Sequence, residues 1–220
     1  MGSFGIANQI GQIREQEYIQ IWDLQLDVIV SKLNGHTETV NFLEELANQI
    51  LLSCSNDHSI RVWDLKNGFS KKLEAHASAV YYLKALSNNS FASNSHDGLI
   101  KIWNGTFETR DYELKNTLKP IGKTSVYDLE VDMERKFLIN CCSEMRSILL
   151  WDLKSFVCVR IIQTNHVVSL NFIKLNPQTN HLFSGSWDKT IQEWSLSNGE
   201  CLKVYRLENE VNKIEFVKSS

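Results

Sequence analysis

Five tryptophans recur along this chain at nearly regular intervals. Trp22, Trp63, Trp103, Trp151 and Trp194 are separated by 41, 40, 48 and 43 residues. Each ends a short run rich in apolar residues, and the runs read YIQIWD, SIRVWD, LIKIWN, ILLWD and TIQEWS. A period of about 40 to 50 residues is typical of architectures that repeat one structural unit. We therefore predict five copies of one unit, with a sixth tryptophan, Trp187, outside the register.

The same order of segments surrounds most of these tryptophans. In the second copy, VNFLEEL at 40–46 alternates with period two, ILLSCS follows at 50–55, and a polar turn precedes the tryptophan strand. A shorter alternating run, KKLEA, comes last. Four short strands bounded by Asn, Asp, Gly and Ser predict a four-stranded antiparallel sheet. Such a sheet cannot bury both faces alone, whereas copies packed face to face around an axis can.

One stretch, 41–51, has a composition that also suits a helix. Its counterparts, VYYLKALSNNSF and VSLNFIKLNPQTNHLF, contain Asn, Ser and Pro at positions that break a helix. We therefore predict strand, turn and strand in all three copies.

Four segments in phase carry a family resemblance. They are GHTETV at 35–40, SCSNDHSIRVWD at 53–64, SNSHDGLIKIWN at 93–104 and SGSWDKTIQEWS at 184–195. These segments are similar to the WD-repeat β-propeller family, and the resemblance covers about residues 10 to 217. It implies an all-β fold, with residues 1–220 forming a single propeller domain of about five four-stranded blades.

The resemblance also implies a structural tetrad of His, Ser or Thr, Asp and Trp in each complete copy. A buried indole N–H needs an acceptor, and a buried imidazole needs both a donor and an acceptor. Carried over, the second and third copies supply His36, Ser53 or Ser55, Asp57 and Trp63, and then His76, Ser93 or Ser95, Asp97 and Trp103.

The other copies depart from this pattern. In the fifth, Thr164 occupies the histidine register and His166 comes two residues late. The remaining departures are Met145 for Asp and Lys123 near the His register in the fourth copy, and Gln16 for Asp in the first. We expect these three copies to depend more on packing than on the tetrad, and to open at lower free energy.

The first copy has room for only three strands, at 9–14, 18–23 and 28–33. The segment VNKIEFVK at 211–218 has the pattern of an innermost strand and no strand after it. We predict that this C-terminal strand completes the N-terminal blade and closes a five-bladed ring. The alternative is a piece of a larger propeller, because seven blades are usual in the family that the chain resembles.

Composition argues against several other classes of protein. The net charge is −3 and no Lys/Arg cluster stands out, so no nucleic-acid interface is predicted. No apolar run approaches the roughly 18 residues of a membrane span. The patterns H-E-x-x-H, G-x-S-x-G and G-x-x-x-x-G-K are absent, and no cysteine has metal-ligand spacing. We predict no catalytic residues, no cofactor and no metal, and a reduced state of the five cysteines in the cytosol or nucleus.

The family resemblance points to one rim of the ring as a binding surface. Its positions are the start of each inner strand and the residue before the turn Asp; here they are Asn41, Tyr81, Tyr127, Ser169 and Asn212, and then Glu15, Asn56, His96, Glu144 and Trp187. Exposed Tyr and Trp are frequent interface anchors. We expect Tyr81, Tyr127 and Trp187 to share this rim and to suit a peptide with an apolar anchor and a basic residue. The alternative is that these aromatic side chains fold down over the core.

The predicted function is a non-enzymatic scaffold that binds a protein or peptide partner on the aromatic rim, as a monomeric propeller or within a larger complex. Two alternatives stay open. One is a structural subunit bound side-on in a large assembly, such as a ribosome-maturation or cytoskeletal complex. The other is the substrate-recognition propeller of a ubiquitin ligase. The long segment at 104–116 is expected to project from the opposite rim.

Overall fold

The computed structural model describes residues 4–7, 17–23, 25–46, 49–106, 109, 111–120, 126–211, 214 and 216. Within these ranges every regular element is a β-strand, and the strands form five antiparallel sheets. The predicted all-β repeat architecture is confirmed. The stretch 41–51 forms parts of two strands rather than a helix.

The sheets follow one another in chain order, and we number them 1 to 5. Sheet 1 contains β1 (Phe4–Ala7), β2 (Tyr18–Asp23) and β3 (Val28–Asn34). Sheet 2 contains β4 (Val40–Leu46), β5 (Ile50–Ser55), β6 (Ser59–Asp64) and β7 (Phe69–Glu74). Sheet 3 contains β8 (Val80–Ser87), β9 (Ser90–Ser95), β10 (Ile100–Gly105) and β11 (Tyr112–Leu118).

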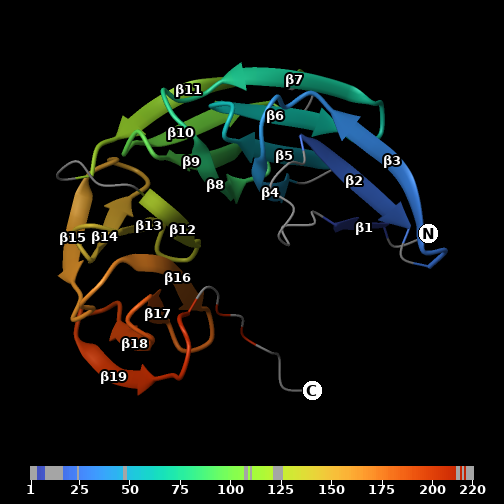
Figure 1. The fold of residues 1–220 in the computed structure, drawn as a ribbon. Helices are drawn as coiled ribbons and strands as arrows, with labels where there is room; N and C mark the ends of the chain where they lie inside the picture. The colour runs from blue at the N-terminus through green and yellow to red at the C-terminus, as the bar shows by residue number, and fades with distance from the viewer. Residues whose placement is uncertain are drawn as a thin grey trace.

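Sheet 4 contains β12 (Val126–Asp132), β13 (Phe137–Cys142), β14 (Ser147–Asp152) and β15 (Cys158–Gln163). Sheet 5 contains β16 (Leu170–Asn176), β17 (His181–Ser186), β18 (Thr190–Ser195) and β19 (Cys201–Arg206). In each of sheets 2 to 5 the strands pair in chain order. Figure 1 shows the five sheets along an arc, with β4, β8, β12 and β16 on its inner side and β7, β11, β15 and β19 on its outer side.

The first sheet differs from the prediction in one strand. The strand that pairs with β2 is Phe4–Ala7, with Ala7 opposite Gln20 and Phe4 opposite Asp23; the predicted strand at 9–14 lies outside the described residues. In sheets 2, 3 and 5 a short turn with an aspartate fixes the corresponding hairpin. Gln16 stands at that register in the first copy, so the sequence does not specify a tight turn there.

The predicted closing strand at 211–218 is only partly described. Val211, Ile214 and Phe216 lie in no strand, and the rest of the pairing falls outside the described residues. The Val211 amide donates to the Ser186 carbonyl at 3.5 Å, and the Phe216 ring lies edge-on to Phe183 with centroids 5.2 Å apart. The described part of this segment therefore contacts sheet 5, and the closure of the ring stays a prediction.

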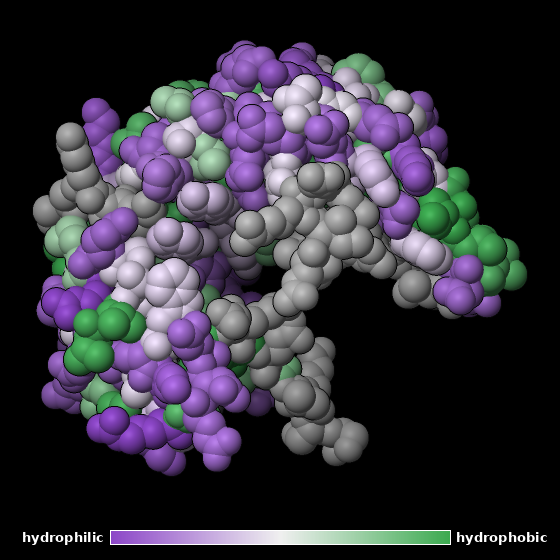
Figure 2. Space-filling model, in the orientation of Figure 1, coloured by the Kyte–Doolittle hydropathy of each residue, from purple (hydrophilic) through white to green (hydrophobic). Residues whose placement is uncertain are grey.

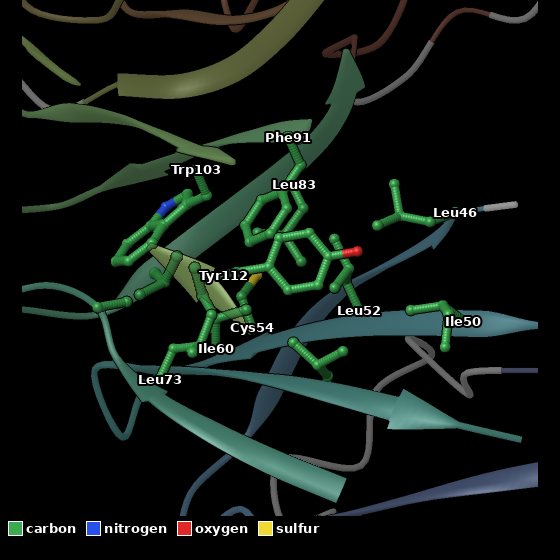
Figure 3. Packing of buried hydrophobic residues seen from close by; sticks show 13 residues of the cluster. Leu46, Ile50, Leu52, Cys54, Ile60, Leu73, Leu83, Phe91, Trp103 and Tyr112 are labelled. Atoms are coloured by element: carbon green, nitrogen blue, oxygen red, sulfur yellow. The ribbon is translucent and has the colours of Figure 1, made fainter. Parts of the chain in front are cut away.

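The core lies in the seams between successive sheets. Figure 3 shows the seam between sheets 2 and 3, where Phe91 stacks on Trp103 with centroids 6.0 Å apart and also contacts Tyr112. Strand β5 is buried at every position because sheets pack against both of its faces. Burial of each large apolar side chain contributes about 1.5–3 kcal/mol, so these seams hold the arc together.

The Asp that follows a tryptophan shapes the outer hairpin. Asp64 Oδ1 accepts hydrogen bonds from the amides of Lys66 and Asn67 at 2.9 and 3.1 Å. Asp152 accepts from Lys154 and Ser155 in the same way. An aspartate that bonds the amides two and three residues later forms an Asx turn. The second residue of the Trp-Asp pair therefore ends the strand and starts the turn.

In sheets 2 to 5, the turn before the tryptophan strand contains a residue with positive φ. Gly98 has φ 79° in sheet 3, and His58 has φ 68° at the matching place in sheet 2. A non-glycine residue in this region costs about 1–2 kcal/mol. We expect His58→Gly to raise the free energy of unfolding by about 0.5–1 kcal/mol. This gain is smaller than the strain that is removed, because glycine gives the unfolded chain more conformational freedom to lose on folding. Chemical denaturation measures this change. Gly98→Ala is the matched control and is expected to lower the stability; a gain from it contradicts the explanation.

Candidate functional site

Sheets 2 and 3 each have four side chains that form a continuous hydrogen-bonded chain. Trp63 Nε1 donates to Ser53 Oγ at 2.8 Å, Ser53 Oγ lies 2.7 Å from His36 Nε2, and His36 Nδ1 lies 2.8 Å from Asp57 Oδ2. The third copy repeats this geometry with Trp103, Ser93, His76 and Asp97 at 2.8, 2.8 and 2.9 Å. Of the two serine alternatives, the first of each pair lies in the chain. Ser55 and Ser95 instead cap the turn by accepting from the amides of Asp57 and Asp97.

The polarity of the chain follows from the protonation of its histidine. Burial lowers the pKa of His36, and the nearby Asp57 only partly offsets this effect. The imidazole is therefore neutral near pH 7. Burial opposes the ionisation of Asp57, but hydrogen bonds from Ser59 and His36 outweigh it and lower the pKa of Asp57 to about 2. A neutral imidazole beside a carboxylate donates from Nδ1 and accepts from the serine at Nε2.

The aspartate also fixes the backbone at one end of the sheet. Asp57 Oδ2 accepts from the Thr37 amide at 3.1 Å, and Oδ1 accepts from the Ser59 amide at 3.0 Å. One carboxylate thus connects the loop before β4 with the turn between β5 and β6. Of the predicted rim positions, Asn56 lies in this turn and Asn41 is the second residue of β4, so the carboxylate fixes the backbone next to both.

Sheet 5 contains a complete tetrad, which the sequence comparison missed. His166 Nδ1 lies 3.0 Å from Asp188 Oδ2, and His166 Nε2 lies 2.9 Å from Ser184 Oγ, which accepts from Trp194 Nε1 at 2.9 Å. The expectation that Thr164 takes the histidine place is wrong, and the expectation that this copy depends more on packing than on the tetrad was based on it. Thr164 is buried and donates to the Arg146 carbonyl at 2.6 Å.

The error came from counting forward from the preceding tryptophan. Trp151 pairs with Cys158 next to a β-bulge, and this copy has extra residues before the inner strand. Counting to the first apolar residue of the inner strand resolves the register: Leu170 follows His166 by four residues, as Val40 follows His36.

Sheet 4 replaces the tetrad with a different acceptor. Trp151 Nε1 donates to Asn140 Oδ1 at 2.7 Å, and Asn140 is fully buried. Asn140 lies on β13 where sheets 2, 3 and 5 have the tetrad serine. Met145 stands at the aspartate position as predicted from the sequence, and Lys123 lies outside the described residues. An amide oxygen therefore satisfies the indole without a histidine.

The two predicted rim tyrosines lie together. The rings of Tyr81 on β8 and Tyr127 on β12 are 5.5 Å apart between centroids and within 7° of parallel. His96 contacts Tyr81 edge-on at 6.1 Å. Both tyrosines are half-buried, and Tyr127 also packs against the apolar cluster of sheets 4 and 5. The pair forms a platform that spans the seam between sheets 3 and 4.

The remaining rim positions differ in exposure and contacts. Asn41 Nδ2 donates to Asn56 Oδ1 and to the Val80 carbonyl of the next sheet, both at 2.8 Å, so this pair ties sheet 2 to sheet 3. Glu144 is exposed at the end of sheet 4, and Trp187 is 49% exposed in the turn before Asp188.

One rim assignment needs correction. Asn171, not Ser169, follows the first apolar residue of β16, for the same reason that His166 replaces Thr164. Glu15 and Asn212 lie outside the described residues.

The repeat pattern matches a known family model. The model described as "WD domain, G-beta repeat" matches residues 28–64, 68–104 and 156–195, together just over half of the 220 residues. The chain belongs to the WD-repeat family. The first match ends at the last residue of β6, the second ends one residue before the end of β10, and the third includes the tetrad histidine of sheet 5.

Curated WD-repeat relatives are similar over parts of their length. Protein groucho of Drosophila melanogaster is 28% identical over 85 residues, which cover 39% of this chain and 11% of that protein. Nuclear distribution protein PAC1-1 of Uncinocarpus reesii is 39% identical over 59 residues, covering 26% of this chain and 13% of that protein. Mitochondrial division protein 1 of Mycosarcoma maydis is 25% identical over 186 residues, covering 84% of this chain and 19% of that protein. The chain spans less than a fifth of the length of each of these relatives.

WD-repeat proteins are generally scaffolds for protein interactions. In the described part of the chain, no helix has the length and apolar character that a membrane crossing requires.

Proposed function

We propose that this WD-repeat chain is a non-enzymatic scaffold that binds an extended segment of a protein partner on the rim formed by Tyr81, Tyr127 and Trp187. The observation that carries the proposal is the stacked pair of Tyr81 and Tyr127, with ring planes within 7° of parallel. The pair sits where sheets 3 and 4 meet, near the first residues of β8 and β12. Tyrosine and tryptophan are the side chains that most often anchor protein interfaces.

The chemistry of the rim suits a partner segment with an apolar anchor and a neighbouring basic residue. The half-exposed indole of Trp187, in sheet 5, gives the anchor an apolar surface. The exposed Glu144, in the turn between β13 and β14 of sheet 4, adds negative charge. The networks under the rim limit its motion, because Asp57, Asp97 and Asp188 each connect a loop to a turn. A preorganised surface loses less entropy on binding.

Trp187→Ala tests the rim with little risk to the fold, since the side chain lies in an exposed turn. Partner proteins co-isolated with the tagged chain are quantified by mass spectrometry, and the affinity of each enriched partner is then measured directly. We expect Trp187→Ala to weaken binding at least tenfold, the loss of about 1.4 kcal/mol or more that marks an interface anchor. The temperature of unfolding should change by less than a few degrees, because surface substitutions usually alter stability by under about 0.5 kcal/mol. Unchanged affinity for every partner contradicts the rim as the binding surface.

A second candidate is attachment through the side of the arc. A hollow of about 850 Å³ lies between sheets 1 and 2, lined in part by Val30, Leu33, Leu65 and Phe69. Figure 2 shows an apolar patch at the turn between β2 and β3, where Leu26, Val28, Ile29 and Val30 are exposed. Contiguous apolar surface of this kind often marks a protein contact. This arrangement suits a structural subunit held side-on in a larger complex.

Val30→Ser separates the two candidates and is the matched control for Trp187→Ala. If partners are lost with Val30→Ser and retained with Trp187→Ala, the side of the arc is the attachment surface. For the chain as a whole we propose action in the cytosol or nucleus on protein partners, as a monomer or within a complex. The net charge of −3 supports protein rather than nucleic-acid partners.

A further inference from the structure

One buried carboxyl group bridges the seam between sheets 4 and 5. Asp128 lies on β12 and is 8% exposed. Its Oδ1 accepts from the Leu129 amide at 2.8 Å, and its Oδ2 accepts from the Ile173 amide on β16 at 3.0 Å. The corresponding residues of sheets 2, 3 and 5 are Phe42, Tyr82 and Phe172. Sheet 4 thus has a carboxyl group where its neighbours have an aromatic ring.

The hydrogen bond from the Ile173 amide to Asp128 gives a partner to one backbone group on the unpaired edge of sheet 5. β16 pairs only with β17, so its inner edge has amides without a strand partner. Glu44 does the same at the seam between sheets 2 and 3, where its Oε1 accepts from the Ala85 amide on β8 at 2.8 Å. Acidic side chains on these two inner strands therefore accept hydrogen bonds from the inner edge of a following sheet. An edge amide bonded in this way is no longer available to pair with another strand.

The cations near Asp128 are already engaged. Glu130 lies between two lysines, with Lys84 Nζ at 2.8 Å and Lys174 Nζ at 2.7 Å. Among the described residues, Asp128 itself forms no ion pair. The titratable and charged groups around it are Glu130 on its own strand, Tyr82 and Lys84 on β8, Cys141 on β13, Lys174 on β16 and, beyond Tyr82, Glu44 on β4.

We propose that Asp128 makes the seam between sheets 4 and 5 a pH-sensitive joint, closed while the carboxyl group is neutral and opening locally once it ionises. An ionised carboxylate that is buried without a cation is unfavourable, and opening the seam returns it to water. The neutral group keeps a carbonyl oxygen for the Ile173 amide, so protonation preserves the bridge.

The direction of the pH effect follows from linkage. Burial and the neighbouring Glu130 raise the pKa of Asp128 to about 7, although the bonds from Ile173 and Leu129 work against them. In the opened seam the pKa returns toward about 3.9. The closed state therefore keeps a proton that the open state releases, and the stability of the seam falls as pH rises toward about 7. Above that pH both states are ionised and the opening constant levels off.

Amide hydrogen exchange of Ile173, followed by NMR, tests this inference on the full chain. We expect its protection factor to fall by up to about tenfold per pH unit between pH 5 and 7, the limit for one linked proton. The quantity compared is the pH dependence of Ile173 protection in wild type and in Asp128→Asn. The comparison is needed because the tetrad histidines stabilise the fold as pH rises, which opposes the effect of Asp128. The variant should lose the component that falls with pH. Asp152→Asn, a turn substitution in the same sheet, should keep it.

Two results overturn the proposal. One is the same pH dependence of Ile173 protection in wild type and in Asp128→Asn. The other is read from the wild type alone, by ¹³C NMR of the aspartate carboxyl carbons: a midpoint for Asp128 below pH 5 shows that the group stays ionised across the physiological range. This second measurement holds even if the asparagine variant does not fold.

Discussion

Replacing Ser184 by alanine is expected to lower the free energy of unfolding by about 2–5 kcal/mol. The hydroxyl of Ser184 accepts from Trp194 Nε1 at 2.9 Å and lies 2.9 Å from His166 Nε2. Alanine leaves both groups buried and without a partner, and each unsatisfied buried group costs about 1–3 kcal/mol. Chemical denaturation followed by tryptophan fluorescence measures the loss. This experiment concerns the copy that appears incomplete in sequence.

The matched control is Ser197→Ala, a serine substitution in the same sheet at an exposed position. Its effect should stay within about 0.5 kcal/mol, as is usual for surface sites. Ser93→Ala provides the comparison with the tetrad of sheet 3, and the two tetrad losses should be of similar size. If Ser184→Ala costs no more than Ser197→Ala, sheet 5 depends on packing alone and its hydrogen-bonded chain contributes little.

The three tetrads are expected to make the protein sensitive to acid. Burial lowers the pKa of His36, His76 and His166, so the unfolded chain takes up protons below about pH 6.5 that the folded chain resists. The stability that they contribute is complete above about pH 6.5 and is lost as pH falls, by up to about 1.4 kcal/mol per pH unit for each histidine. Asp57 and Asp97 have pKa values of about 2, so their contribution is lost later, as pH falls below about 4.

The geometry explains why protonation is unfavourable. A second proton on His36 would sit at Nε2, which faces the Ser53 hydroxyl. The serine oxygen already accepts from Trp63 Nε1, so it would meet two donors and lose its own acceptor. The whole chain of bonds must rearrange to accommodate one proton.

Denaturation curves from pH 7 to pH 4 measure this effect. His166→Gln removes one of the three tetrad histidines. It should therefore reduce the slope of the unfolding free energy against pH by up to about 1.4 kcal/mol per pH unit. His181→Gln serves as the control, because His181 is half-exposed, belongs to no tetrad and pairs with Glu193 at the surface. Equal changes of slope in the two variants contradict the assignment of acid sensitivity to the tetrads.

The repeat architecture was predictable because its signals are local. The alternation of each strand, the small residues of β5 and β9, and the Asp that starts each turn are legible in short windows. The tetrad residues of sheets 2 and 3 were also legible, because their copies have the same length. The choice between Ser53 and Ser55 was not, since both lie on one face of β5 and only the position of the Trp63 indole along the strand separates them.

The errors arose where loop lengths change. A bulge at Trp151 and extra residues before β16 shift the register of sheet 5, so a count from the preceding tryptophan reaches Thr164 instead of His166. The absence of a turn aspartate in the first copy similarly hid the pairing of Phe4–Ala7 with β2. Hydrogen bonding depends on position in space, and a residue added to a loop leaves that position unchanged while it alters every count.

The amino-acid sequence by itself determined the repeat, the four-stranded unit, the family and the side-chain types at the rim, because each follows from a periodic pattern of side chains. Only the tertiary structure decided which groups meet across the seams. The stacking of Tyr81 on Tyr127 and the placement of Asp128 against the Ile173 amide both join residues of different sheets. Such contacts depend on how one sheet packs against the next, and no pattern within a single copy records that packing.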